Sequence, residues 1–284
     1  MTSSTQPVAH GAFDAREAPA ARHGTSPVPG ARARSLASGI TLDYGPRDLL
    51  APFFLRAEEV ALAEGVRLSF ATLDELVAIN RANSDSWRPI LPIFDPRFGV
   101  RPENAFCIVG RDKAGEVVAT QAGRLYTWTS SSFHEECESL RILYDEPEKH
   151  RRHDESMEVT APAAKRVAGR VLFSGAVWNR RDHRGGILST LLPRIGRAYA
   201  LTRWSTDYTA SFMAEGVVKG GVAARVGYRN VDWEIRMHHT PVWRDGTIRA
   251  ALIWMNTDYL LSDLGSFARG LEAEVDPFIQ YGAA

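Results

Sequence analysis

The sequence predicts a mixed α/β fold in one domain, with helices flanking a central sheet. Segments with a strand pattern alternate with segments of helical period between residues 66 and 274. Hydrophobic residues make up 44% of the 284 residues, which is enough for one sizeable domain or two small ones. The chain shows no internal repeat, so the alternation indicates one sheet rather than an array of repeated units.

The first 42 residues differ from the rest in composition. They are rich in Ala, Pro, Ser, Gly and Arg and carry no apolar period. Such a segment buries too little surface to offset its ordering entropy, so we expect a disordered tail over residues 1–42 and a folded domain over residues 43–284. A transit peptide is the alternative, and Asp14 and Glu17 count against it.

The first half of the domain predicts a strand, a helix and a hairpin. Alternation favours a strand at 66–70, and Asp74 and Glu75 suit the start of the helix that follows. An Asp-Lys-Ala-Gly turn joins the two hairpin strands. The predicted elements are a strand at 66–70, a helix at 74–82, strands at 106–109 and 117–128, a helix at 131–140 and a surface loop at 144–155.

The second half begins with a strongly apolar strand. A polar turn and a Gly pair follow it, and then a segment with one apolar helical face. Gly227 stands where a helix commonly ends. The predicted elements are a strand at 170–178, a helix at 187–204, a strand at 208–213, a helix at 217–226, strands at 231–237 and 248–255, and a helix at 257–274.

The turn between the strand at 170–178 and its helix has the features of an anion site. The first amides of a helix lack internal partners, and the helix dipole makes that end partly positive. Gly185 and Gly186 allow close approach of a phosphate, and Arg184 can add a charge-assisted contact. The GxxxxGK[ST] and GxGxxG patterns are absent, so neither a P-loop nor a dinucleotide fold is indicated. An ordinary strand-to-helix corner would carry similar glycines.

Residues 177–204 resemble the cofactor-binding motif of the GNAT superfamily of N-acyltransferases. There a strand leads into an Arg/Gln-x-x-Gly-x-Gly/Ala loop and a long helix, and Gly227-Tyr228 is similar to the Gly-aromatic pair that ends the next helix. An ungapped match puts Arg184 at the first position, Ile187 at the first Gly and Ser189 at the last small residue. A match shifted by one puts Gly186 on that Gly, with His183 at the first position and Leu188 at the last. The resemblance implies a mostly antiparallel sheet and a cofactor site. Its residues are Val177 and Trp178 beside the pantetheine arm, and Arg184, Gly185, Gly186, Ile187, Leu188 and Ser189 around the pyrophosphate.

The resemblance implies acyl transfer to an amine. The co-substrate would be acetyl-CoA or another acyl-CoA, the acceptor a small-molecule or peptide amine, and the attack direct. Two alternatives stay open: a non-catalytic CoA-binding or sensor module of the same fold, and an enzyme similar to acyl-homoserine-lactone synthases. An assay of thiol release with a panel of amines separates the first alternative from an enzyme.

Family members often use a Tyr four residues before the Gly-aromatic pair to protonate the departing thiolate. Ala223 occupies that position here. Tyr228 and Tyr208 are the nearest candidates, and Tyr199 lies one helix earlier. Each of these tyrosines also suits a packing role.

Glu215 is the first candidate for the base, because it follows the strand that borders the expected thioester site. It also suits the first turn of the following helix. Asp207, Glu158 and Asp182 are weaker candidates.

Composition and motifs argue against several other classes. The 34 basic and 34 acidic residues balance, so a nucleic-acid partner is not expected. No apolar run reaches the roughly 20 residues that span a bilayer, and no signal-peptide core is present, so we expect a cytoplasmic protein with no membrane partner. Neither a metal site nor a serine-hydrolase elbow is expected, and the two cysteines suit neither a disulfide nor a nucleophile. A homodimer is left open.

Overall fold

An eight-stranded mixed sheet is the centre of the computed structural model, which describes residues 35–242 and 246–275. The spatial order of the strands is β1-β2-β3-β5-β6-β8-β7-β4. Every neighbouring pair is antiparallel except β5 and β6, which are parallel. The predicted fold class, a mixed and mostly antiparallel sheet flanked by helices, is confirmed.

The elements follow the predicted order closely. The strands are β1 Arg67–Ala71, β2 Ala105–Arg111, β3 Val117–Trp128, β4 Ser156–Val159, β5 Gly169–Asn179, β6 Tyr208–Ala214, β7 Asn230–His238 and β8 Thr247–Asn256. The α-helices are α1 Arg47–Ala63, α2 Leu73–Ala82, α3 Phe133–Glu138, α4 Pro147–His150, α5 Leu188–Trp204, α6 Glu215–Lys219, α7 Val222–Arg225 and α8 Thr257–Val275.

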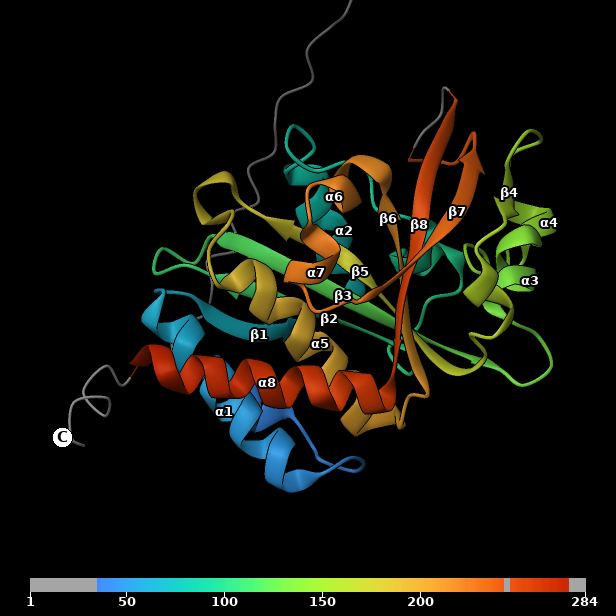
Figure 1. Cartoon of the computed structure of the whole chain (residues 1–284). Helices are drawn as coiled ribbons and strands as arrows, with labels where there is room; N and C mark the ends of the chain where they lie inside the picture. Colours follow the sequence, from blue (N-terminus) through green and yellow to red (C-terminus); the bar gives the residue numbers. More distant parts are fainter. Residues whose placement is uncertain (1–34, 243–245, 276–284) are drawn as a thin grey trace, which may run out of the picture. The chain divides into compact units, whose positions relative to one another are not determined.

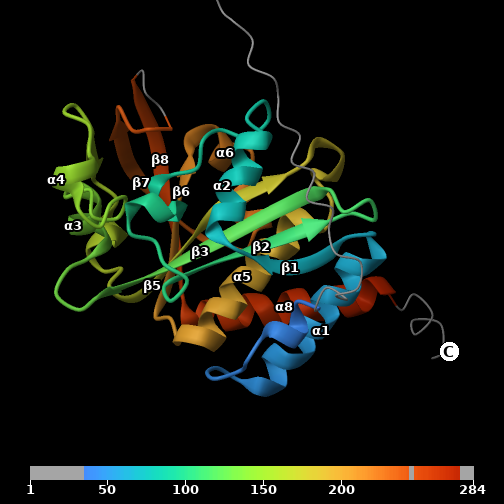
Figure 2. The same cartoon turned by 180° about the vertical axis from the view of Figure 1, so that it is seen from behind.

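The sheet separates two hydrophobic cores. Helices α1, α5 and α8 lie together on one face, as Figure 1 shows, and their apolar side chains form one core with β1, β2 and β8. Figure 2 shows α2 on the opposite face, where it forms the second core with the segment after it and with α3. A group on β5 or β6 can therefore face either core, depending on the alternation of the strand.

Four features differ from the sequence prediction. The 17-residue helix α1 and the edge strand β4 were not predicted. The single helix expected at 217–226 is two short helices, because Gly221 between them adopts a left-handed φ of +72°. Within the predicted loop at 144–155, the chain forms the short helix α4.

The predicted tail falls mostly outside the described residues. Residues 1–34 of it are not described, and its last part packs on the domain. Leu36 is buried, and its N–H donates to Glu58 on α1 at 2.9 Å. The folded domain therefore begins several residues before residue 43. Among the described residues, no helix has both the length and the apolar character needed to cross a membrane.

Candidate active site

Strands β5 and β6 separate from one another after a short parallel ladder. Only residues 171–173 of β5 pair with residues 208–210 of β6. Beyond this ladder β5 still pairs with β3 as far as Asn179, and β6 still pairs with β8 as far as Ala214. The facing edges of the two strands are thus unpaired towards their carboxyl ends, which is where ligands commonly bind in open α/β sheets.

A bulge in β5 accompanies the separation. The register with β3 shifts between Thr120 and Ala122, and Ala176 opposite this shift has a φ of +50°. The hydroxyl of Thr120 donates to the Ala176 carbonyl at 2.8 Å and holds the bulge in place. Because a bulge bends its strand, it directs the end of β5 away from β6.

The loop from β5 to α5 brings free amides to the same end of the strands. Ile187 precedes the first turn of α5 without a side-chain cap. In the described part of the chain, the N–H groups of residues 185–188 have no hydrogen-bond partner. Gly185 has a φ of +79°, and a Cβ built on it would meet no atom within 4 Å. Free amides of this kind at a helix start can bind an anion.

Two predicted loop residues are engaged within the protein. The N–H and hydroxyl of Ser189 both donate to the Gly186 carbonyl, at 3.1 and 2.7 Å. The guanidinium of Arg184 folds back on the end of β5, where it donates to the carbonyls of Asn179 at 3.1 Å and Ser86 at 3.4 Å. Arg184 therefore braces the loop, and its exposed position leaves it near any anion bound there.

A cleft of about 290 Å³ lies over the gap between β5 and β6. Its floor comes from Phe173 and residues 175–177 of β5 and from Ser211, Phe212 and Ala214 of β6. The segment at 87–94 forms one wall, and Met237, Ile248 and Ala250 form the other. Since Phe94, Phe173 and Met237 belong to the core around α2, the cleft opens on the face opposite α5.

The two predicted residues at the end of β5 lie in this region. Val177 lines the cleft and is 42% exposed. Trp178 is buried, stacks on Trp87 with ring centroids 5.6 Å apart, and donates from Nε1 to the Ser86 hydroxyl at 3.2 Å. The Trp178 side chain thus supports the cleft wall. Its backbone belongs to the part of β5 that pairs with β3 but not with β6.

Solved structures of similar fold are acetyltransferases. RimJ from Mycobacterium smegmatis, in complex with CoA-disulfide, matches 72% of this chain and 90% of its own, with 15% identity and a TM-score of 0.43. NAA60 from Arabidopsis thaliana, in complex with acetyl-CoA, matches 68% of this chain and 99% of its own, with 10% identity and a TM-score of 0.43. SpeG spermidine N-acetyltransferase from Vibrio cholerae matches 69% of this chain and 95% of its own, with 10% identity and a TM-score of 0.41.

Two of these three structures hold a CoA compound, and the third is a spermidine N-acetyltransferase. No family model and no curated protein sequence matches this chain.

Behind the point where β5 and β6 separate lies a cluster of buried polar groups on the α5 face. Ser174 is the first β5 residue beyond the ladder with β6, and its hydroxyl accepts from Gln121 Nε2 at 3.3 Å. Arg197 of α5 is fully buried, and its guanidinium carbon lies 4.9 Å from the centre of the Tyr228 ring. Gln121 Oε1, Arg197 Nε and Nη1 and Tyr228 Oη have no hydrogen-bond partner among the described residues.

The Tyr228 hydroxyl is protonated at neutral pH. Burial raises its pKa above the ordinary value, and the nearby Arg197 and Ser174 side chains partly counteract this effect. Neither neighbour meets the geometry of a hydrogen bond to Oη. Tyr228 can therefore donate a proton, and the cation beside it stabilises the phenolate that remains.

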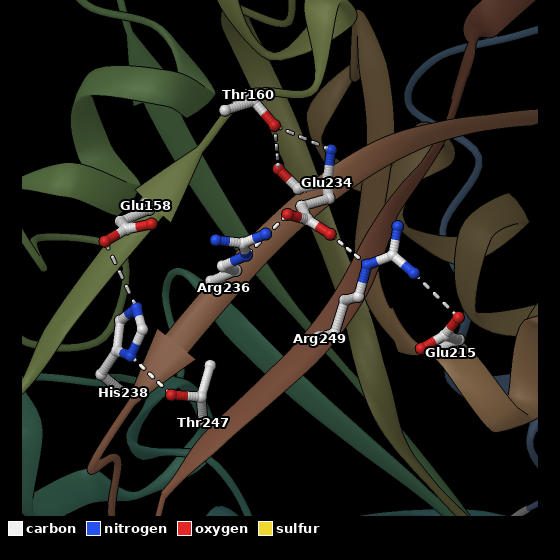
Figure 3. Close-up of polar contacts among 8 residues, drawn as sticks. All are labelled: Glu158, Thr160, Glu215, Glu234, Arg236, His238, Thr247 and Arg249. Carbon is white, nitrogen blue, oxygen red and sulfur yellow. Dashed lines mark hydrogen bonds and ion pairs between the residues drawn. The ribbon is translucent and has the colours of Figure 1, made fainter.

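Glu215 lies at the end of β6, beside the mouth of the gap. It accepts from Arg249 at 2.8 Å and pairs with Lys219 at 3.0 Å. The hydrogen bond from Lys219 and the charge of Arg249 hold the pKa of Glu215 below its ordinary value. Figure 3 shows that Arg249 also pairs with Glu234, which bonds Arg236 at 2.6 Å, so Glu215 ends a chain of alternating charges on β7 and β8.

The other predicted candidates lie away from the cleft. Tyr208 pairs with Val171 at the closed end of β6, and its ring lies 6.0 Å from that of Trp254. At the same end, Asp207 accepts from the Arg170 N–H at 2.7 Å. The structure therefore brings Glu215, but not Tyr208, to the open end of β6.

Glu158, Asp182 and Tyr199 are also outside the cleft lining. Glu158 is on the edge strand β4, where it pairs with His238 at 3.5 Å. Asp182 bonds Arg180 at 2.8 Å in the loop, and the ring of Tyr199 packs 4.6 Å from that of Phe70. None of them is placed to act on a group in the cleft.

Both cysteines are buried and free. Burial raises the pKa of the Cys107 thiol to about 12 and that of Cys137 well above its ordinary value. Neither thiol ionises at neutral pH, as the sequence predicted. In the described part of the chain, no group of three or more His, Cys, Asp and Glu side chains is arranged to hold a metal ion.

Proposed function

We propose that this protein transfers an acyl group from a CoA thioester to an amine. The observation that carries the proposal is that two features meet at one end of the β5-α5-β6 unit. The free amides of residues 185–188 suit a pyrophosphate, and the unpaired edge of β5 suits an extended chain of amide groups. Bound acyl-CoA supplies the activated thioester.

In this proposal the residues predicted around the cofactor keep distinct roles. The N–H groups of Gly185, Gly186, Ile187 and Leu188 bind the diphosphate, and Arg184 braces the loop beside it. The backbone at Val177 and Trp178 binds the pantetheine arm. Ser189 supports the first turn through the Gly186 carbonyl rather than offering its N–H.

Tyr228 is proposed as the group that protonates the departing thiolate. It reaches the separation point of β5 and β6 from the α5 face, and its hydroxyl has no competing acceptor among the described residues. The amine approaches from the cleft on the opposite face. Attack and protonation are thereby assigned to opposite sides of the sheet.

The function is tested by following thiol release from acetyl-CoA with a panel of amines. Turnover that depends on both substrates is expected. Saturable CoA binding without thiol release from any acyl donor would instead favour a non-catalytic CoA-binding module, and the absence of carboxylates in the cleft lining keeps that second candidate in view.

Replacing Tyr228 with phenylalanine is expected to lower kcat by about 100-fold, the size typical of a lost general acid, with little change in the KM for acyl-CoA. Because Oη makes no hydrogen bond, its removal should leave the melting temperature unchanged. Tyr208→Phe at the closed end of β6 is the matched control and should retain full kcat. Wild-type kcat in Tyr228→Phe would remove Tyr228 from the mechanism.

Glu215 stays a proposed base, but its surroundings predict a small contribution. A carboxylate with a lowered pKa and two cationic partners accepts a proton poorly at neutral pH. Glu215→Gln should therefore reduce kcat/KM by less than about tenfold. The kcat/KM of Glu215→Gln should still fall at acidic pH, as that of the wild type does. A much larger loss, together with disappearance of that fall, would show that Glu215 is the base.

A further inference from the structure

The lining of the cleft is aromatic and aliphatic. The side chains that surround it include Trp87, Phe94, Phe173, Phe212, Met237 and Ile248. None of the described residues that line it is Asp or Glu, and the one charged lining side chain, Arg88, is cationic. The cleft therefore offers no ion-pair partner to an ammonium group.

Its size limits the ligand. A cavity of about 150 Å³ is known to hold benzene, and this cleft has about 290 Å³. One ring with a short arm fits that space, whereas a large polycyclic body does not. Phe94 and Phe173 are almost completely buried, whereas the partly exposed rings of Trp87 and Phe212 are open to a further ring.

The apolar lining also acts on the charge of an amine. Removal from water disfavours the ammonium form, so an amine that enters the cleft loses its proton more readily. Only the neutral amine has the lone pair needed for attack, which reduces the need for a carboxylate base. A second ammonium group on the same molecule would find no carboxylate among the described residues of the lining.

We infer that the acceptor is a primary arylalkylamine with a single cationic group. Its ring would contact Trp87 and Phe212, and its nitrogen would lie at the gap between β5 and β6. This inference rests on the proposed function and names its substrate class. In the reaction the lone pair of the neutral amine nitrogen forms the C–N bond as the C–S bond breaks, the sulfur takes a proton from Tyr228, and the one proton that the nitrogen loses passes through solvent to the Tyr228 phenolate.

Binding tests the inference without requiring turnover. The affinities of 2-phenylethylamine and spermidine for the full chain are measured by calorimetry, with the fluorescence of Trp87 at the cleft wall as a second readout. We expect 2-phenylethylamine to bind at least about tenfold more tightly, since only spermidine brings additional charges. Equal or tighter binding of spermidine would overturn the inference.

A carboxylate added to the cleft should reduce the preference for 2-phenylethylamine over spermidine. Leu91→Glu places an acid in the half-buried part of the lining, and Pro89→Glu does so at an exposed lining position where folding is not at risk. Leu55→Glu, on the 59% exposed Leu55 of α1, is the matched control. Either cleft variant should reduce the affinity ratio by about tenfold or more, and the control should leave it unchanged. An unchanged ratio in folded Pro89→Glu contradicts the inference.

Thiol release separates this inference from the proposed function. If 2-phenylethylamine binds as expected but no thiol is released from acetyl-CoA, the proposed acyl transfer is wrong. The assignment of the cleft as an arylalkylamine site then still stands. If spermidine is acetylated in preference to 2-phenylethylamine, the proposed acyl transfer is supported and the assignment of the cleft as an arylalkylamine site is wrong.

Discussion

Replacing Gly186 with valine should raise the dissociation constant for CoA about 100-fold. Hydrogen bonds to a charged group contribute about 1.5–3 kcal/mol each. Losing two of them from the amides of residues 185–188 corresponds to that factor. Gly186 lies in the middle of these amides, and a side chain there would stand between them and a diphosphate. Isothermal titration with CoA measures the change.

The same substitution should leave the fold intact. A Cβ at Gly186 would come no closer than 3.9 Å to another atom, at the His183 carbonyl, and its φ is not left-handed. The free energy of unfolding should change by no more than about 0.5 kcal/mol, as for other open surface positions. Gly185 is less suitable, because its φ of +79° would strain any substitution.

Gly270→Val on α8 provides the control. Gly270 is exposed, lacks a left-handed φ, and its added Cβ would meet nothing within 4 Å. CoA affinity should be unaffected in this variant. If Gly186→Val bound CoA as tightly as the wild type, the diphosphate would not lie on these amides, and the proposed transferase would lose the observation on which it rests.

The sequence predicted most elements because their patterns are local. Strand β5 is a continuous apolar run, and the helix α5 shows one apolar face. Helix α1 has apolar residues at helical spacing, but Pro52 inside it argues against a helix when the sequence is read alone. Strand β4 has only four residues and depends on pairing with β7, which is far away in the sequence.

The site was predictable only in part for the same reason. The glycines and the helix start mark the anion site in the sequence itself. The divergence of β5 from β6 depends on a bulge opposite Gln121, which no local pattern indicates. Likewise, nothing near Tyr228 in the sequence reveals that Arg197 lies against its ring.

The segment at 87–94 also shows why the site could be predicted only in part. Phe94 belongs to the core, while Trp87 and Leu91 line the cleft. The charge of the cleft, and therefore the class of amine, could not be predicted because the opposite wall comes from β7 and β8.

Removing the carboxylate of Asp263 should strongly destabilise the fold. Asp263 on α8 accepts two hydrogen bonds from Arg194, at 2.9 and 3.1 Å, and pairs with Arg197 at 3.6 Å. Both arginines are on α5 and are almost completely buried. Breaking a buried ion pair of this kind costs about 3–5 kcal/mol. Asp263→Ala should therefore lower the melting temperature by roughly 10 °C.

Asp258→Ala is the matched control in the same helix. Asp258 is exposed in the first turn of α8, where its interaction with the helix dipole contributes at most about 1 kcal/mol. Thermal unfolding followed by circular dichroism compares the two variants. A melting temperature for Asp263→Ala within 2–3 °C of the control, about 1 kcal/mol, would show that the two arginines find other partners.

Removing the charges of Arg194, Arg197 and Asp263 together tests why Asp263→Ala loses stability. If two uncompensated cations cause the destabilisation, then Arg194→Met, Arg197→Met and Asp263→Leu together should recover most of the lost stability. Activity should not recover with it, because Arg197 donates to the Val226 carbonyl at 2.6 Å and lies against the Tyr228 ring. If the triple variant is stable but has a low kcat, the buried ion pairs serve to position Tyr228 against α5. If it keeps the full kcat, these three residues serve folding alone.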